Sequence, residues 1–499
     1  MVHVAVVGAY GSAGVAVTEE LLQSDLEDLE VTLIDDGDPG GGLCILRGCM
    51  PSKDVLSAGE HRYQARHDDR LDGVPEVDCE AIVERKDEHV QQFAAHRRET
   101  VHAFADRENV ELLRETARFV DDRVLAVGDR ERERELEPDY VVIATGSVPN
   151  VPDLPGIEDM DVATSADVLD ATEFPESGVV MGFGYIGLEL APYLSEVGGM
   201  DITVIEHGDR PLEEMESEYG ETILELYCEH FDIEVLTNAD ERRVEATDDG
   251  GVRLTLDSER DEGDESDGSA NRNDETVEAD QLFAFTGRNP NLDGLGLEHT
   301  SLEPETGWVD ATMQARDDER VFVVGDANGR EPILHVAKEQ GFAAGENVVR
   351  HARGEDLEPY ANVPHHVIFS GMGVYPFARL GHTPATVAKT KMDAVVVTRE
   401  ASSDGVFATK NHPEGRATLV VSEADGSVLG YQGLHYHADV MAKTMQLAVE
   451  MSLDVREIPR RAYHPTTPEI LDGLIREACA ELGESQHCVG EPELPDIGL

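Results

Sequence analysis

The chain has 499 residues, which is too long for one hydrophobic core, so we expect two to four domains. Its 104 acidic residues outnumber its 40 basic residues, and the formal net charge of −64 is spread along the chain. Such a surface repels nucleic acid and anionic membranes, which excludes both as partners. The charge fits an ordinary acidic cytosolic protein or, as we favour, adaptation to very high salt, where the Debye length falls to about 3 Å.

The N-terminal residues and the cysteine content bear on location. Met1 is followed directly by an apolar run without a basic segment, and no stretch of about 20 apolar residues occurs anywhere. Six cysteines are too few for the disulfide framework of a secreted protein. We therefore expect a soluble, cytoplasmic protein.

The N-terminal segment shows the layout of a dinucleotide-binding βαβ unit. A β-rich run, Val2–Val7, leads into a glycine loop and a helical pattern, and the next strand, Val31–Ile34, ends at Asp35. Glycines in such a loop let the backbone approach a pyrophosphate, and the acid binds a ribose hydroxyl. Aligned on its last two glycines, the loop has Ala9 at the first glycine position and then Tyr10 as an additional residue. The loop glycines are Gly8, Gly11 and Gly14.

Two cysteines separated by four residues, Cys44 and Cys49, follow this unit. Glycines precede them at Gly41–Gly42, and the sequence Pro51–Lys53 marks a helix start after them. The pair can therefore close a small disulfide loop, although two reduced, packed thiols or a metal site also fit this spacing. With so few cysteines in the chain, the pair indicates catalysis.

The middle of the chain begins with a long helical region that we expect from Pro51 to about Glu115. The charged run Asp129–Glu137 is expected in an exposed hairpin. An apolar strand, Asp139–Ile143, then ends in an Ala-Thr-Gly sequence and is expected to be buried. This tripeptide consists of Ala144, Thr145 and Gly146.

A second βαβ unit carries an intact G-x-G-x-x-G motif. A helix to about Val197 and a strand at Ile202–Ile205 follow, and Glu206 stands 19 residues after the last glycine of the motif. Glu206 can bond both ribose hydroxyls of NAD and would repel the 2′-phosphate of NADP, whereas Arg210 could accommodate that phosphate. We favour NAD. The motif glycines are Gly182, Gly184 and Gly187.

The segments after this unit return to a sheet. Asp257–Thr276 is polar and lacks apolar periodicity, so we expect a solvated insertion within a hairpin. A strand at Val321–Val324 runs into Gly325 and Asp326, and a helix is expected over Leu334–Val349.

The C-terminal part, residues 351–499, is expected to combine strands with helices. Near its end, His464 is followed by Pro-Thr and by Glu469. The expected strands and helices lie near Ala394–Val397, Arg416–Val421, Ser427–Leu434, Ala438–Met451 and Pro468–Leu482.

In this order the motifs resemble those of the pyridine nucleotide-disulfide oxidoreductases, the family of dihydrolipoamide dehydrogenase, glutathione reductase and mercuric reductase. The cysteine stretch, the Ala-Thr-Gly strand, both glycine loops, the turn Gly287–Asn291 and the C-terminal His-Pro-Thr sequence carry the resemblance. It implies an α/β fold with two Rossmann-like domains and a C-terminal α+β dimerisation domain. The implied boundaries are 1–150 and 284–350 for FAD binding, 151–283 for NAD(P) binding and 351–499 for the interface. The segment Phe369–Gly381 is longer than is usual in the family.

The resemblance also implies a reaction. Electrons would pass between NAD, FAD and a Cys44–Cys49 redox disulfide, with NADP the less favoured nucleotide. Cys49 would contact the flavin, and Cys44 would exchange with the substrate as a thiolate. His464, oriented by Glu469, would act as general acid and base, and it would come from the partner subunit of a homodimer.

Cofactor contacts follow from the same resemblance. Lys53 and Glu189 match an ion pair beside the flavin, with a simple surface pair as the alternative. Asp35 is a shorter version of the usual glutamate at the FAD ribose, and Asp326 would hold the ribityl chain. Further implied contacts are the two sets of motif glycines and Gly42, Ala144, Thr145, Gly146, Gly287 and Ala337.

The substrate is left open by the resemblance. With Glu206 present, dihydrolipoamide dehydrogenase is the first choice, and a lipoyl-bearing acyltransferase of a 2-oxoacid dehydrogenase complex is the partner that this implies. An NADPH-dependent reductase of a small-thiol disulfide is the second choice, and mercuric reductase is the third. A structural flavoprotein would have lost Cys44, Cys49 or His464, and none is lost. No metal site is expected, because the other cysteines lack ligand spacing; they are Cys79, Cys228, Cys479 and Cys488.

Overall fold

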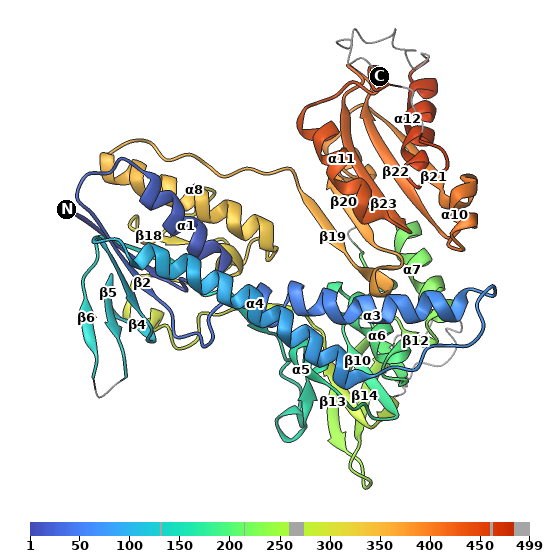
Figure 1. The fold of residues 1–499 in the computed structure, drawn as a ribbon, viewed down its shortest axis with the longest axis horizontal. Helices are drawn as coiled ribbons and strands as arrows, with labels where there is room; N and C mark the ends of the chain where they lie inside the picture. Colours follow the sequence, from blue (N-terminus) through green and yellow to red (C-terminus); the bar gives the residue numbers. More distant parts are fainter. Residues whose placement is uncertain (130–131, 214, 259–273, 460–462, 484–499) are drawn as a thin grey trace, which may run out of the picture.

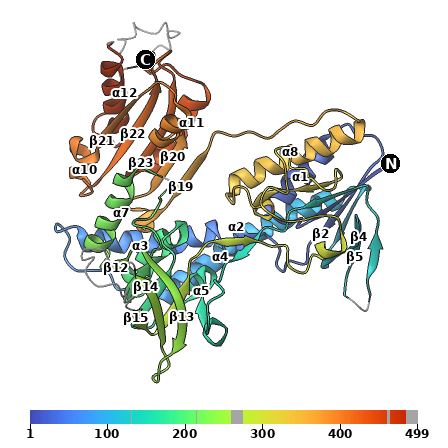
Figure 2. The same cartoon turned by 180° about the vertical axis from the view of Figure 1, so that it is seen from behind.

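The computed structural model describes residues 1–129, 132–213, 215–258, 274–459 and 463–483. The chain forms three lobes, and two helices, α3 (Cys49–His67) and α4 (Cys79–Ala105), extend from the first lobe to the second (Figures 1 and 2). The first two lobes each contain a parallel sheet, and the third contains an antiparallel sheet with helices. The predicted fold class is confirmed. Among the described residues, no helix is long and apolar enough to cross a membrane.

The first lobe is built on a parallel sheet in the order β18-β7-β1-β2-β3. Its strands are nearly continuous apolar runs because both faces are covered. Helices α1 (Ser12–Gln23) and α8 (Leu334–Arg353) pack over one face, and a three-stranded antiparallel sheet covers the other. The parallel strands are β1 (Val2–Val7), β2 (Leu29–Ile34), β3 (Val110–Leu113), β7 (Tyr140–Ile143) and β18 (Val321–Val323). The antiparallel strands are β4 (Ala117–Asp121), β5 (Val124–Val127) and β6 (Arg134–Leu136).

The second lobe repeats this plan with the strand order β12-β11-β10-β16-β9. Helices α5 (Ser165–Asp170), α6 (Tyr185–Glu196) and α7 (Ser217–His230) lie on one side, and an antiparallel sheet packs on the other. The parallel strands are β9 (Val162–Ala163), β10 (Ser177–Met181), β11 (Asp201–Ile205), β12 (Ile233–Leu236) and β16 (Gln281–Ala284). The antiparallel strands are β13 (Ala239–Ala246), β14 (Val252–Ser258) and β15 (Asp274–Ala279).

The chain crosses between these two lobes twice, and the crossings pair with each other. β8 (Ser147–Pro149) runs antiparallel to β17 (Arg288–Pro290). Just beyond β17, the backbone N–H of Asn291 donates to the carbonyl of Gly146 at 2.9 Å. The Ala-Thr-Gly strand end and the Gly-Arg-x-Pro-Asn turn therefore form one junction.

The third lobe holds an antiparallel sheet in the order β19-β20-β23-β22-β21. Helices α11 and α12 pack on it and share its apolar core. The strands are β19 (His365–Ile368), β20 (Phe377–Gly381), β21 (Ala394–Glu400), β22 (Gly415–Ser422) and β23 (Val428–His435). The helices are α9 (Pro384–Thr390), α10 (Gly405–Thr409), α11 (Ala438–Glu450) and α12 (Glu469–Glu481), and a short α2 (Leu43–Leu46) precedes α3 in the first lobe. The strands and helices predicted for this part are confirmed.

One predicted element is wrong in extent. The helical region does not run unbroken from Pro51 to Glu115, because α3 ends at His67, α4 begins at Cys79 and β3 begins at Val110. The break at residues 68–78 contains a glycine and a proline, which interrupt helices. The hairpin expected for the charged run is present as β5 and β6, apart from residues 130–131, which lie outside the described residues. Most of the polar insertion, residues 259–273, also lies outside them, and the flanking strands β14 and β15 pair as a hairpin.

Candidate active site

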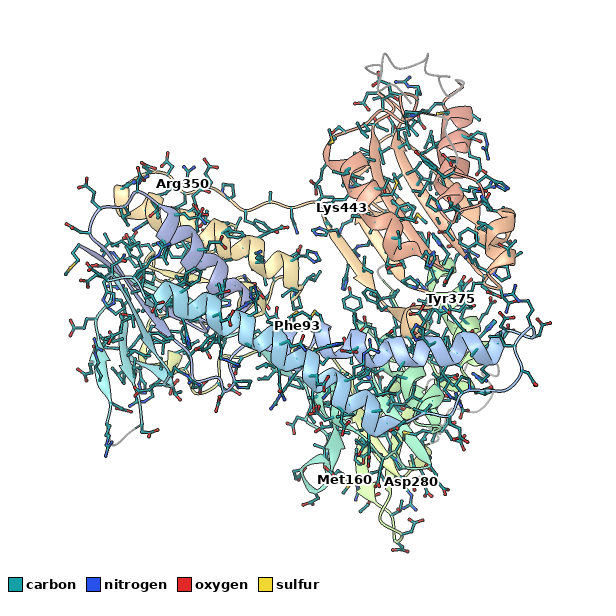
Figure 3. All side chains as sticks on the ribbon, viewed as in Figure 1. Phe93, Met160, Asp280, Arg350, Tyr375 and Lys443 are labelled. Carbon is teal, nitrogen blue, oxygen red and sulfur yellow. The ribbon has the colours of Figure 1, made fainter. Side chains whose placement is uncertain are left out.

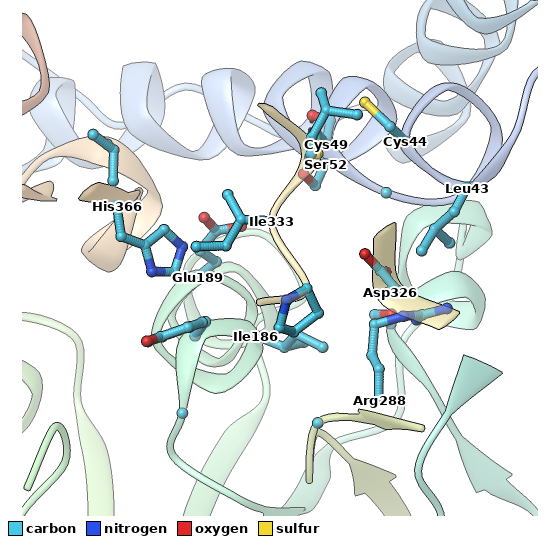
Figure 4. A pocket seen from close by; sticks show the side chains of 18 of the residues that line it. Leu43, Cys44, Cys49, Ser52, Ile186, Glu189, Arg288, Asp326, Ile333 and His366 are labelled. Atoms are coloured by element: carbon cyan, nitrogen blue, oxygen red, sulfur yellow. Dashed lines mark hydrogen bonds between the residues drawn. The ribbon is translucent and has the colours of Figure 1, made fainter. Parts of the chain in front are cut away.

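A cavity of about 1320 Å³ lies where the three lobes meet, and Figure 4 shows part of its wall. It is lined by the N-terminal ends of α1 and α6, by both cysteines and by β19 and β20 of the third lobe. Lys443 of α11 also lines it, and Figure 3 shows this residue on the side of the third lobe that faces α8. One continuous space therefore touches both glycine loops and the cysteine pair.

The two cysteines lie side by side, Cys44 on α2 and Cys49 at the start of α3 (Figure 4). Both are free thiols in this structure, and they hydrogen bond to each other. The hydrogen bond from Cys44, with help from the ammonium of Lys53, lowers the pKa of Cys49 to about 7. The same hydrogen bond and burial raise the pKa of Cys44. In the reduced pair the thiolate is therefore on Cys49, and the proton stays on Cys44.

The predicted pair of Lys53 and Glu189 joins α3 to α6. Lys53 Nζ donates to both carboxylate oxygens of Glu189, each at 2.7 Å. Glu189 Oε1 also accepts the backbone N–H of Phe369 at 3.0 Å, and Lys53 Nζ stands 4.6 Å from the centre of the Phe369 ring. The Glu189 side chain is only 16% exposed, so this is a half-buried junction of all three lobes and not a simple surface pair.

The two glycine loops have the same construction but different lengths. Gly8 and Gly182 both have φ of +95°, and a Cβ there would lie 2.3 Å from Ala144 O and 2.8 Å from Phe285 O, respectively. A Cβ at Gly14 would lie 2.3 Å from Gly8 O, just as a Cβ at Gly187 would lie 2.4 Å from Gly182 O. The first glycine of the N-terminal loop is therefore Gly8, which corrects the alignment that placed Ala9 there.

The two strand-end acids differ in exposure to the cavity. Asp35 Oδ2 accepts the backbone N–H of Tyr10 and Oδ1 that of Gly37, both at 2.8 Å, and burial raises its pKa. Asp35 does not line the cavity. Glu206 does line it, and its Oε1 accepts the backbone N–H of Gly208 at 2.9 Å. Burial raises the pKa of Glu206 as well.

Asp326 sits at the N-terminal end of the turn that precedes α8, opposite the cysteines. Its Oδ2 accepts the hydroxyl of Ser147 at 2.6 Å, and the guanidinium of Arg288 donates to the same hydroxyl at 2.9 Å. The neighbouring Thr145 has a buried Oγ1 without a hydrogen-bond partner among the described residues. An unpaired buried hydroxyl, a carboxylate and two glycine cradles fit a bound dinucleotide such as FAD.

His464 and Glu469 form the predicted pair but stand apart from the cavity. His464 Nδ1 lies 2.7 Å from Glu469 Oε1, and the His464 side chain is 78% exposed. Neither residue lines the cavity of its own chain. Glu469 begins α12, which lies at the end of the third lobe away from α3 (Figure 1).

The structure brings most predicted site residues to one cavity. Those that line it are Gly11, Gly42, Cys44, Cys49, Lys53, Ala144, Gly146, Gly182, Gly184, Glu189, Glu206, Gly287, Asp326 and Ala337. Those that do not are Gly8, Gly14, Asp35, Thr145, Gly187, His464 and Glu469. Of the other cysteines, Cys479 is buried, Cys79 is half-buried and Cys228 is exposed, while Cys488 lies outside the described residues.

Several lining residues were not predicted. Tyr185 and His366 meet edge to face in the cavity with ring centroids 4.2 Å apart, and burial lowers the pKa of His366 to about 4, so that its ring is neutral at physiological pH. His207 and Glu241 also line the cavity and form a pair. Tyr185 and His207 adjoin predicted motif residues, which was the available signal. His366 and Glu241 carried none.

Comparison with known proteins agrees with this architecture. Residues 2–341 match the family model described as "Pyridine nucleotide-disulphide oxidoreductase", and residues 367–474 match the dimerisation domain of the same family. Dihydrolipoyl dehydrogenase of Bacillus subtilis is 29% identical and covers 90% of this chain and 91% of its own length. The dihydrolipoyl dehydrogenase of Halobacterium salinarum is also 29% identical and covers 97% of each chain. The crystal structure of LpdA from Mycobacterium tuberculosis superposes with a TM-score of 0.79 at 21% identity, over 96% of this chain and 99% of that one.

Proposed function

The chain belongs to the pyridine nucleotide-disulphide oxidoreductase family, a family of FAD-dependent enzymes, and from this premise we propose that it is a dihydrolipoyl dehydrogenase. The reaction would oxidise a dihydrolipoyl dithiol to the cyclic disulfide and reduce NAD⁺ to NADH. The observation that carries the proposal is the cavity in which the Cys44–Cys49 pair, the Lys53–Glu189 junction and both glycine loops meet. Curated dihydrolipoyl dehydrogenases that align over most of the chain support the choice of substrate.

The two cysteines have different roles in this proposal. Cys44 exchanges with the substrate dithiol, because thiol–disulfide exchange proceeds through a mixed disulfide at one sulfur. Cys49 is the sulfur that leaves as a thiolate, and its pKa of about 7 makes it a good leaving group near neutral pH. The substrate dithiol loses two electrons and two protons, and NAD⁺ takes up both electrons and one proton as hydride.

The second proton needs an acceptor at the exchange site. We assign this role to His464 of the partner subunit, because His464 of the same chain does not line the cavity. Its Nδ1 lies 2.7 Å from Glu469 Oε1, which would leave Nε2 to take up the proton. The match to a dimerisation domain supports this homodimer.

The remaining residues bind and orient the cofactors. FAD, when bound, supplies two-electron transfer between the cysteine pair and the nicotinamide. Asp326, which accepts the hydroxyl of Ser147, would accept hydrogen bonds from the ribityl hydroxyls of FAD. Lys53, fixed by Glu189, places a positive charge beside Cys49 and the flavin site.

NAD is the nucleotide that this site supports better than NADP. Glu206 presents a carboxylate to the cavity, where it would accept the ribose hydroxyls. Arg210, the cation that could bind a 2′-phosphate, already donates to both oxygens of Asp209 at 2.7 and 2.8 Å. The net charge of −64 supports a high-salt source, and the cytoplasmic location stays a prediction.

A steady-state screen in molar KCl tests the proposal. We expect NAD⁺-dependent oxidation of dihydrolipoamide, and much lower rates of reduction of small-thiol disulfides or Hg(II) with NADH or NADPH. A protein that reduces glutathione-type disulfides or Hg(II) faster than lipoamide would contradict the substrate but not the family. A lipoyl domain as substrate, compared with free dihydrolipoamide, tests the acyltransferase partner.

A further inference from the structure

Three charged side chains lie at the end of the cavity next to the acid of the second glycine unit. His207 directly follows Glu206, Arg210 lies three residues beyond His207, and Glu241 comes from β13. Glu206 is the expected ribose acceptor, so this group surrounds the adenosine end of the nucleotide. No role follows for Glu241 from the glycine motif, because it lies 35 residues beyond Glu206.

Glu241 is almost completely buried and uses only half of its carboxylate. The Glu241 side chain is 6% exposed, and its Oε2 lies 2.5 Å from His207 Nε2. Its Oε1 is buried without a hydrogen-bond partner among the described residues. A buried, unpaired carboxylate oxygen destabilises the fold, so a donor from a ligand in the cavity would be favourable there.

The pairing also decides what His207 can bind. The hydrogen bond to Glu241 raises the pKa of His207 to about 9, so its ring is an imidazolium at neutral pH. The His207 imidazolium forms an ion pair with Glu241, and the Arg210 guanidinium forms one with Asp209. A 2′-phosphate is a dianion without a proton to donate, and it would meet the carboxylates of Glu206 and Glu241, while His207 and Arg210 each already pair with a carboxylate.

We propose that Glu241 is a specificity-determining residue for the nucleotide. One oxygen holds His207 away from a 2′-phosphate, and the free oxygen accepts a hydrogen bond from the adenosine half of the unphosphorylated nucleotide. This inference rests on the proposed NAD(H)-dependent function and adds a second carboxylate to the selection that Glu206 provides.

Ligand binding tests the proposal without turnover. Adenosine diphosphate ribose and its 2′-phosphorylated analogue are titrated by calorimetry into the purified, FAD-loaded protein. The variants are Glu241→Gln, which keeps the shape and removes the charge, and Glu245→Gln as matched control. Glu245 lies on the same strand and pairs with Arg243 at 2.6 Å outside the cavity.

The wild type and Glu245→Gln are expected to prefer the unphosphorylated ligand. In Glu241→Gln the phosphorylated ligand should bind about tenfold more tightly, a change of about 1.4 kcal/mol, and the unphosphorylated ligand several-fold more weakly. Adding His207→Gln to Glu241→Gln should remove the gain, because the ring nitrogen of His207 that now contacts Glu241 becomes free to donate a hydrogen bond to the phosphate. His207→Gln alone keeps the test informative if the carboxylate variant folds poorly, and it should weaken binding of the phosphorylated ligand further.

Three results would overturn the inference: an unchanged ratio of the two affinities in Glu241→Gln, a wild type that prefers the phosphorylated ligand, or no binding of either. These results are separate from failure of the proposed function. If the ratio shifts as expected but the wild type oxidises no dithiol with NAD⁺, then Glu241 selects the nucleotide and the proposed reaction is wrong.

Discussion

The two glycine-loop units of this chain share a backbone plan but present it differently to the cavity. In the first unit, the loop from Gly8 to Gly14 has one extra residue, Tyr10. The backbone N–H of Tyr10 donates a hydrogen bond to one carboxylate oxygen of Asp35. In the second, the shorter loop leaves Glu206 on the cavity wall.

The surroundings of Tyr10 continue this difference. Its side chain is buried, its hydroxyl contacts His102 Nε2 at 3.2 Å, and its carbonyl accepts the guanidinium of Arg97 at 3.1 Å. Residues of α4 therefore contact the first loop next to its acid, whereas the acid of the second unit, which also accepts a backbone N–H group, lines the cavity. The difference suits a cofactor that stays bound in the first unit and a nucleotide that exchanges in the second.

Replacing the last glycine of each loop with alanine should have the largest effect, and the effect should differ between the two units. Gly14→Ala and Gly187→Ala each place a Cβ within 2.5 Å of a backbone carbonyl. Such overpacking costs about 1–3 kcal/mol or more, because backbone cannot move aside cheaply. Gly14→Ala should lower the FAD content of the purified protein at least tenfold. Gly187→Ala should keep its FAD and bind NADH at least tenfold more weakly.

Absorbance and nucleotide titration check both glycine variants. Gly405→Ala is the control, since nothing lies within 4 Å of a Cβ there and its φ is not positive. Loss of FAD from Gly187→Ala, with Gly14→Ala unaffected, would contradict the assignment of the two loops.

Removing the two acids should also distinguish the two units, through the KM for NAD⁺ in one and through stability in the other. Glu206→Ala should raise the KM for NAD⁺ by about ten- to a hundredfold, because a hydrogen bond to a charged group contributes about 1.5–3 kcal/mol. Asp35→Ala should leave that KM unchanged. It should lower the midpoint temperature of thermal unfolding, because two backbone N–H groups lose the carboxylate that accepts their hydrogen bonds. Steady-state kinetics and thermal unfolding distinguish the two variants. A raised KM for NAD⁺ in Asp35→Ala would contradict the different roles assigned to the two acids.

The pH dependence of the His207–Glu241 pair should be the smallest effect, because the His207 side chain is 62% exposed. Its pKa is raised from 6.5 to about 9 on folding, so the pair stabilises the fold fully below about pH 6.5. That stabilisation is lost as the pH rises to about 9 and beyond. The difference in denaturant midpoint between the wild type and Glu241→Gln should shrink over this range. A difference that grows with pH would contradict the pairing.

Local patterns predicted more than distant contacts did. Residues close in sequence predicted both βαβ units and the His464–Glu469 pair, because short spacing along the chain fixes the local geometry. The contact of Lys53 with Glu189, 136 residues apart, came only from the family resemblance. The pairing of Glu241 with His207 had no signal at all, because backbone hydrogen bonds between residues 206–208 and 238–239 bring the two distant segments together. The glycine and proline at residues 68–78 are the local signal of the break in the helical region.

The proposed reaction requires that a flavin share the cavity with a nicotinamide and with a thiolate on Cys49. Anaerobic titration of the protein with NADH, followed by its absorbance spectrum, tests it most directly. The account predicts a long-wavelength charge-transfer band that grows as the pH rises through about 7, is absent in Cys49→Ser and persists in Cys44→Ser. A flavin that NADH does not reduce, or a band that survives in Cys49→Ser, would contradict it.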